Sequence, residues 1–283
     1  MSHKGGKNKM SKEIKDPQVL KSLKPLSPPI TEKGVSALVP QGPWCYAMEF
    51  IAVHFLTNIS DLKSIIPKQL IPTGDVWAYV SSIVAVSKSW PEFYIEVPDL
   101  SQYMEAALFT KVNFNGKSYA YCPFMYVDKD LPLMRGYIVG FPKKIAKISI
   151  TTFHKMLPGY EKPREGVVLS GFAIRSSYPL LKIRLKLEKP CEKLPIENFG
   201  PFLLPRYLPQ LTPEVGGFAK LVSLESIVKY GDKWEGSADI ELIGGINDEL
   251  SLIPIKKVLR GYYYQCYLEI DVKTVKQVAD LEI

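Results

Sequence analysis

An Asn-Gly pair between two strand-like runs is the sequence feature that most restricts the fold of this chain. Asn115-Gly116 separates the largely apolar runs 103–114 and 117–127. A type I′ turn needs a positive φ angle at both of its central residues, and Asn followed by Gly meets this need best. The sequence therefore predicts a β-hairpin over 103–127.

Several other stretches have the pattern of strands. Apolar residues at positions 181, 183, 185 and 187 alternate with charged residues, which predicts a strand with one buried face over 180–187. Further strands are predicted at 45–56, 76–86, 145–153, 167–175, 218–228, 238–243 and 262–272. Short helices are predicted at 61–66 and 131–139, and after Asp271 or Thr274. Because the chain shows no βαβ rhythm, the predicted fold class is α+β and mostly β, with an antiparallel, barrel-like or sandwich core and a few short peripheral helices.

The positive charge is concentrated in the first part of the chain. Residues 1–25 hold seven lysines against Glu13 and Asp16, which gives +5 of the formal +7 of the 283 residues. Because only +2 remains for the rest, the composition does not predict a nucleic-acid surface. We expect 1–25 to be a disordered basic tail and 26–283 to form a single domain.

The cysteines and histidines form no metal-binding or disulfide pattern. The four cysteines lie far apart without a CxxC pair, and no two of the three histidines have the spacing of metal ligands. This predicts reduced cysteines and no metal site. The sequence shows no signal peptide and no apolar window of membrane-helix length, so we expect a cytoplasmic protein without a membrane partner.

Two adjacent lysines follow a proline in the segment Gly140-Phe141-Pro142-Lys143-Lys144. Neighbouring side chains of a strand point to opposite faces, so one lysine is a candidate for burial and the other for the rim of a pocket. Burial in apolar surroundings lowers the pKa of a lysine, and the free amine forms Schiff bases with ketones. The alternative is a solvated lysine pair on an exposed strand.

This lysine segment resembles the active-site segment of the acetoacetate decarboxylase family. Six other stretches resemble that family in the same order: Gly42-Pro43-Trp44, Ile65-Ile66-Pro67, Tyr103-Met104-Glu105, Phe114-Asn115-Gly116, Trp234-x-Gly236 and Leu252-Ile253-Pro254-Ile255-Lys256. The resemblance covers about residues 38–281. It implies an antiparallel β-barrel or cone-like core with additional strands, and a homo-oligomer.

The resemblance also implies roles for single residues. Lys143 matches the Schiff-base lysine, Lys144 the neighbouring cation, and Glu105 the glutamate near the bound substrate, although Glu105 could also be a rim carboxylate paired with a lysine. Acetoacetate decarboxylase is itself a standard example of a lysine activated in this way. Three further residues are predicted to line the wall of the pocket: Phe141, Met125 and Tyr126. The chemistry needs no metal and no organic cofactor.

The chain departs from the family pattern where a substrate carboxylate would be held. The strand at 45–56 contains no arginine, although the family's substrate-orienting arginine lies there, and Val80 stands where a further glutamate is expected. Arg135 could supply the missing cation only if its loop folds inward, and a solvated surface arginine is the expected outcome. The resulting hypotheses are a Schiff-base lyase that decarboxylates acetoacetate or a related β-keto acid, an aldolase, dehydratase or hydratase relative acting on a 2-oxo acid or another carbonyl compound, and a non-catalytic protein that binds a carbonyl ligand.

Overall fold

The computed structural model describes residues 24–282 of the chain. The basic tail predicted over 1–25 lies outside the described residues except for its last two positions. The division of the chain into this tail and one domain therefore stays a prediction.

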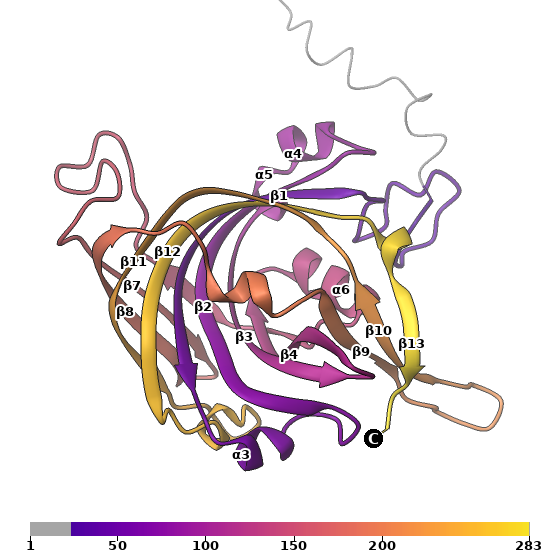
Figure 1. Ribbon diagram of the computed structural model, residues 1–283. Coiled ribbons are helices and arrows are strands. Elements are labelled where there is room, and N and C mark those ends of the chain that lie inside the picture. Colours follow the sequence, from indigo (N-terminus) through magenta and orange to yellow (C-terminus); the bar gives the residue numbers. More distant parts are fainter. Residues whose placement is uncertain (1–23, 283) are drawn as a thin grey trace, which may run out of the picture.

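The strands of the described residues form a single sheet (Figure 1), and most neighbours in it are antiparallel. Its order is β13-β10-β9-β4-β3-β2-β1-β12-β11-β8-β7-β6, and β5 pairs with β4 beside this path. The strands are β1 (Trp44–Leu56), β2 (Ile71–Ser87), β3 (Gln102–Phe114), β4 (Lys117–Val127), β5 (Lys143–Ile145), β6 (Lys147–Ile150), β7 (Val168–Arg175), β8 (Tyr178–Pro190), β9 (Phe202–Leu208), β10 (Phe218–Leu224), β11 (Ile227–Leu242), β12 (Lys257–Ile270) and β13 (Lys276–Asp280).

The helices are short and lie at the periphery of the sheet. They are α3 (Ile59–Lys63), α4 (Glu92–Glu96), α5 (Pro98–Ser101) and α6 (Asp130–Val139), with single 3₁₀ turns η1 (Pro195–Asn198), η2 (Leu250–Leu252) and η3 (Val272–Thr274). None of the helices between residues 24 and 282 has the length and apolar character of a membrane span. The fold class predicted from the sequence, mostly β with a few short peripheral helices, is confirmed.

The predicted hairpin is present as β3 and β4. Asn115 and Gly116 have φ angles of 48° and 73°, both positive as a type I′ turn requires. The strands on either side pair antiparallel, and Phe114 lies opposite Lys117. The turn chemistry of two residues thus fixes the register of strands that carry a large part of the interior.

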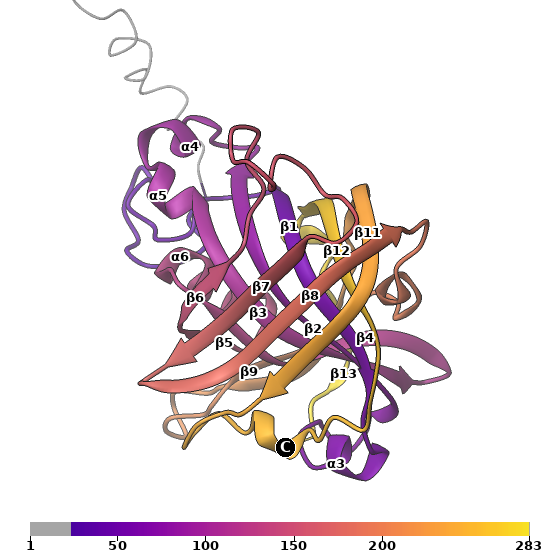
Figure 2. The same ribbon diagram turned by 90° about the vertical axis from the view of Figure 1, so that its left-hand side faces the viewer.

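The sheet curls so strongly that its middle strands are covered on both faces (Figures 1 and 2). On one face, side chains of β1, β2 and β3 pack with others from β4, β9, β10 and β12 around a first core. On the opposite face, alternate side chains of β1, β2 and β3 pack against β6, β7 and β8 in a second core. Because both faces are buried, the middle of these strands is almost continuously apolar and does not alternate.

The structure corrects several predicted boundaries. The run 218–228 is not one strand, because it ends at Leu224 and a new strand begins at Ile227. The C-terminal helix is only the 3₁₀ turn η3, capped by the Asp271 side chain, and β13 follows it. Strand β9 lies inside a proline-rich segment where the sequence showed no strand pattern. The run 145–153 becomes β5, which begins earlier, and β6.

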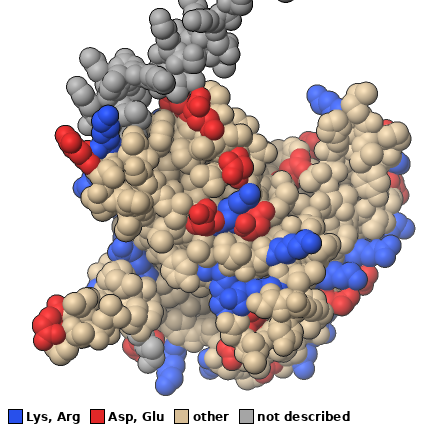
Figure 3. All heavy atoms as spheres, turned by 180° about the vertical axis from the view of Figure 1, so that it is seen from behind, with Lys and Arg blue, Asp and Glu red and all other residues tan. Residues whose placement is uncertain are grey.

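Charged side chains of both signs are interspersed on the surface. On the face drawn in Figure 3, lysines and arginines lie among aspartates and glutamates, in agreement with the small net charge outside the tail. The four cysteines, Cys45, Cys122, Cys191 and Cys266, form no disulfide among the described residues.

Candidate active site

The lysine pair lies directly after a helix that ends beside the sheet. Helix α6 stops at Gly140, whose φ of 106° is left-handed, and β5 begins three residues later. Strand β5 pairs parallel with β4, so that Lys143 lies beside Met125 and Lys144 beside Tyr126. As the alternation of a strand predicts, the two lysines point to opposite faces: Lys143 is 5% exposed, and Lys144 is half-buried on the other face.

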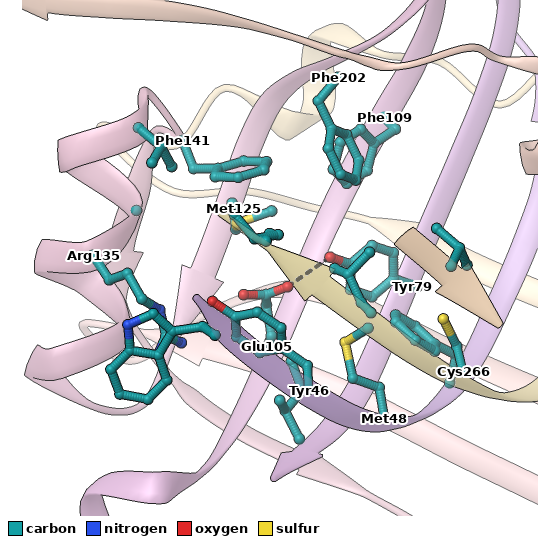
Figure 4. Close-up of a pocket in the computed structure, with 18 of the residues that line it drawn as sticks. Tyr46, Met48, Tyr79, Glu105, Phe109, Met125, Arg135, Phe141, Phe202 and Cys266 are labelled. Carbon is teal, nitrogen blue, oxygen red and sulfur yellow. Dashed lines mark hydrogen bonds between the residues drawn. The ribbon is translucent and has the colours of Figure 1, made fainter. Parts of the chain in front are cut away.

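Lys143 lies in a cavity of about 150 Å³ inside the first core. The cavity is bounded by side chains of β1, β2, β3, β4, β9, β11 and β12 and by one face of α6 (Figure 4). Among the described residues that line it, the charged ones are Glu105, Arg135 and Lys143, and the others are apolar or aromatic except for a glycine. We call this cavity the lysine chamber.

Burial sets the electrostatics of the Lys143 amine. Its Nζ lies 2.7 Å from Glu105 Oε2, 5.7 Å from the centre of the Tyr103 ring and 5.9 Å from that of Phe141. Burial lowers the pKa of Lys143; the Glu105 carboxylate raises it and the Arg135 guanidinium lowers it further, and the net direction is downward. The chamber therefore favours the neutral, nucleophilic amine more than bulk water does.

Glu105 is held in place from two sides. It lies in β3, is 6% exposed, and accepts a hydrogen bond from Tyr79 Oη at 2.7 Å on Oε1, while Oε2 faces Lys143 (Figure 4). Burial, and then the nearby Glu105, raise the pKa of Tyr79 well above its ordinary value, so the phenol stays a donor. The arrangement leaves Glu105 in contact with the Lys143 amine.

Arg135 is buried, so the prediction of a solvated surface arginine at this position is wrong. It is 7% exposed, lies on α6, and its guanidinium carbon is 4.5 Å from the Trp44 ring centre and 4.8 Å from that of Tyr46. A helical signal was available: Arg135 follows Leu131 by four residues and precedes Val139 by four, and residues so spaced share one helix face. Both neighbours are buried, so that face turns inward.

Two predicted site residues lie outside the lysine chamber. The Lys144 amine pairs with Asp248 Oδ1 at 2.9 Å, and Tyr126 Oη donates to the same oxygen at 3.1 Å. Tyr126 belongs to the second core, so its predicted role as a wall residue is wrong. Lys144 does not face Lys143, and the nearby cation is Arg135 instead. Met125 and Phe141 do line the chamber, as predicted.

Gly136 is a residue that the sequence did not single out. A Cβ atom at this position of α6 would lie 2.5 Å from Cδ and 2.8 Å from Cε of Lys143. The absence of a side chain therefore leaves the space that the lysine stem occupies. Among residues 24–282 no cluster of three or more His, Cys, Asp or Glu side chains could hold a metal ion.

Known proteins with similar sequences and folds are described as decarboxylases or related enzymes. The chain is 24% identical over 235 residues to an acetoacetate decarboxylase of Burkholderia ambifaria, which covers 80% of this chain and 85% of that protein. It superimposes with a TM-score of 0.85 on an acetoacetate decarboxylase-like enzyme from Sphingomonas wittichii, at 24% identity over 91% of this chain and all of that one.

A second solved structure of similar fold is the enduracididine biosynthesis enzyme MppR, complexed with the condensation product of pyruvate and imidazole 4-carboxaldehyde. Its TM-score is 0.81 at 20% identity, over 92% of this chain and 98% of that one. The family model described as acetoacetate decarboxylase (ADC) matches residues 27–279. Since this match spans most of the sequence, the chain belongs to the acetoacetate decarboxylase family.

Proposed function

We propose that the protein is a Schiff-base-forming lyase whose Lys143 amine condenses with the carbonyl group of a small keto acid. The observation that carries this proposal is the buried position of Lys143 in a chamber that lowers its pKa. A lysine with its ordinary pKa of about 10.4 is almost entirely protonated at neutral pH, whereas a desolvated one is a nucleophile.

In the proposed reaction, the amine attacks the carbonyl carbon, water leaves, and a protonated imine remains on Lys143. Glu105, at 2.7 Å from the amine, is within reach of the protons that move during imine formation and hydrolysis. The protonated imine withdraws electrons from the neighbouring carbon, so a bond to that carbon can break with its electron pair moving toward nitrogen.

The first fate of this imine is decarboxylation of acetoacetate or a related β-keto acid. Loss of CO2 leaves an enamine, which takes up a proton at carbon and is hydrolysed to a ketone and the free amine. Membership in the acetoacetate decarboxylase family and the description of the curated relatives support this fate. The apolar wall of the chamber supports it as well, because loss of a carboxylate charge is favoured there.

A second fate, an aldolase or dehydratase type of reaction on a 2-oxo acid, is favoured by Arg135. The guanidinium lies in the chamber with Lys143, and planar guanidinium groups bind carboxylates in a two-pronged way. The complex of MppR with a condensation product of pyruvate offers a parallel within the same fold.

Borohydride trapping tests the imine directly. The protein is reduced in the presence of acetoacetate or pyruvate, and the modified residue is located by peptide mass spectrometry. We expect an adduct on Lys143, no adduct in Lys143→Ala, and an adduct of undiminished yield in Lys144→Ala. An adduct on Lys144, or none in the unaltered protein, would contradict the proposal and favour a protein that only binds a carbonyl ligand. Measuring CO2 release over a panel of β-keto and 2-oxo acids then separates the two fates.

A further inference from the structure

Arg135 carries a charge that its surroundings leave largely uncompensated. Its Nη2 donates to Tyr103 Oη at 3.1 Å, but its buried Nη1 has no hydrogen-bond partner among the described residues. None of the ion pairs formed between residues 24 and 282 includes Arg135. Aromatic rings on β1 and β3 offset part of the cost of burying the charge, but a guanidinium has five donors to satisfy.

We infer that Arg135 binds the carboxylate of the substrate and holds it while Lys143 reacts. A guanidinium presents two parallel N–H donors that match a carboxylate, and a buried arginine without a protein counter-ion is completed by such a ligand. Arg135 lines the chamber that also contains the Lys143 amine, and its buried Nη1 has no hydrogen-bond partner among the described residues. The guanidinium carbon and the lysine nitrogen lie 5.6 and 5.7 Å from the centre of the same Tyr103 ring.

Helix α6 places the Arg135 guanidinium and the Lys143 amine so that one bound ligand can contact both. Arg135 and Gly136 are consecutive, and the Lys143 stem passes directly over Gly136. A ligand whose carbonyl carbon reaches the lysine nitrogen therefore lies in the same chamber as the guanidinium. Figure 4 shows Arg135 on one side of Glu105, with Met48 and Cys266 on the other, and the described residues that line the chamber include no charged side chain besides Glu105, Arg135 and Lys143.

The position of Arg135 selects the chemical class of the substrate, an inference that rests on the proposed imine at Lys143. An ion pair with Arg135 stabilises the carboxylate, and the group loses this stabilisation if it leaves as CO2. Arg135 thus favours a reaction in which the carboxylate stays on the substrate. The class is a 2-oxo acid with an apolar remainder, in which the carboxylate carbon is bonded to the carbon that Lys143 attacks.

The covalent step proposed for a 2-oxo acid uses three residues of the chamber: Lys143, Glu105 and Arg135. The Lys143 nitrogen forms a double bond to C2 of the 2-oxo acid, and the carbonyl oxygen leaves as water. Glu105 then accepts a proton from C3, the electrons of that C–H bond form the C2–C3 double bond of an enamine, and the imine nitrogen becomes neutral. The C1 carboxylate remains on Arg135 throughout. In D2O the enamine takes up a deuteron at C3 when it returns to the imine, and hydrolysis then releases the 2-oxo acid with deuterium at C3.

Calorimetric titration with ligands that cannot form an imine tests the carboxylate site separately from the lysine chemistry. The probes are 2-hydroxybutanoate and its uncharged amide, which differ in charge and little in shape. We expect the unaltered protein to bind the acid about tenfold more tightly than the amide, since hydrogen bonds to charged groups contribute that much. In Arg135→Met the two affinities should become equal through loss of acid binding, with amide binding unchanged.

Arg184→Met is the matched control, because Arg184 lies exposed on β8, and it should keep the preference for the acid. Equal affinities in the unaltered protein, no measurable binding of the acid, or a preference that survives in Arg135→Met would overturn the inference. Parallel loss of amide and acid binding in Arg135→Met would also overturn it, because the arginine would then only shape the chamber.

Proton exchange separates failure of this inference from failure of the proposed function. The exchange of the C3 hydrogens of 2-oxobutanoate for deuterium in D2O is measured by NMR. We expect the unaltered protein to catalyse this exchange, and Arg135→Met to catalyse it with a raised KM. A preference for the acid without exchange and without a borohydride adduct would contradict the imine and leave the carboxylate site standing. An adduct without the preference would contradict the carboxylate site alone.

Discussion

The two neighbouring lysines lie in surroundings of opposite kinds. Lys143 is in the lysine chamber, where the Glu105 carboxylate contacts its amine, Arg135 is the other charged residue among the described lining residues, and most of the remaining lining is apolar or aromatic. Lys144 belongs to a cluster around the buried Asp248, which also receives Arg175 Nη1 at 3.2 Å and the Tyr126 hydroxyl. We call this the Asp248 cluster.

The comparison separates groups that hold the fold from groups available for chemistry. In the Asp248 cluster both oxygens of the carboxylate accept hydrogen bonds, so removing any of the partners lowers the stability of the fold. In the lysine chamber, Arg135 Nη1 has no hydrogen-bond partner within residues 24–282, and the Lys143 amine is desolvated. Such incomplete compensation is typical of sites that a ligand completes. Each prediction below alters one of the two regions and should leave the other unchanged.

The largest effect is expected for Asp248→Ala. This change leaves the Tyr126 hydroxyl without its acceptor and two cations without their counter-ion. We expect the free energy of unfolding to fall by about 3 kcal/mol, the low end for a buried ion pair, because Lys144 and Arg175 can reach water. Urea unfolding gives the value, and Asp239→Ala, an exposed acid of β11, serves as the control. An unchanged unfolding midpoint would contradict a stabilising role of the Asp248 cluster. Loss of the Lys143 adduct in a folded variant would contradict the independence of the lysine chamber from this cluster.

Gly136→Ala should damage the lysine chamber and spare the fold. The new methyl group would overlap the Lys143 stem, so the amine must move away from Glu105. A displacement of about 1 Å can cost roughly 100-fold in rate, and we expect that loss in the rate of adduct formation. Gly216→Ala is the control, since a Cβ there meets nothing within 4 Å. A rate within twofold of the unaltered protein would show that the glycine is not needed.

Met125→Gln should wet the lysine chamber without removing a reacting group. Met125 lies beside Lys143 in the register of β4 and β5, and a polar amide there favours the ammonium form. The pKa of Lys143 should rise, the acid limb of the rate profile should move to higher pH, and the rate at neutral pH should fall about tenfold, since each pKa unit changes the amine fraction tenfold. Met104→Gln, on the other face of β3, is the comparison. An acid limb that stays in place would contradict apolar burial as the cause.

The smallest effect is expected for Tyr126→Phe. It removes one hydroxyl from the Asp248 cluster, and burial and then Asp248 raise the pKa of that hydroxyl, so it acts only as a donor. We expect a loss of about 1 kcal/mol in the free energy of unfolding and an unchanged rate of adduct formation. Tyr178→Phe, an exposed tyrosine of β8, should change neither quantity. A slowed adduct in Tyr126→Phe would bring this residue back into the site.

Local chemistry explains the parts of the structure that the sequence could predict. The Asn115-Gly116 hairpin and the opposite directions of Lys143 and Lys144 follow from backbone rules that act within a few residues. The break between β10 and β11 could not be predicted from the sequence, because residues 225–226 include no glycine or proline. The predicted homo-oligomer and the absence of a cofactor stay predictions.

Contacts between distant segments account for what the sequence missed in the candidate site. Asp248 lies 104 residues from Lys144, and no local pattern connects them. Arg135 could have been assigned to the inner face of α6 from its spacing, but its aromatic surroundings come from β1 and β3. The sequence pointed to Lys143, the amine for which we propose the chemistry, whereas the curvature of the sheet decided that Arg135 lies in the same chamber.

A lowered pKa of Lys143 also makes stability depend on pH. The unfolded chain keeps this proton up to the ordinary lysine pKa of about 10.4. The folded protein releases it at lower pH. Between these two values the unfolded state binds more protons, so stability rises with pH, and it is level on either side. The same titration produces the neutral amine, so the rate of adduct formation should rise with pH through the lowered value.

The pH dependence of Lys143 labelling in the folded protein tests the central claim most directly. The fraction of Lys143 modified by trace acetic anhydride is followed by peptide mass spectrometry across the pH range, with the urea-unfolded protein as reference. We predict that Lys143 in the folded protein reaches half of its maximal labelling rate at a lower pH than in the unfolded reference. Identical half-points in the two states would contradict a desolvated amine and, with it, the proposed chemistry.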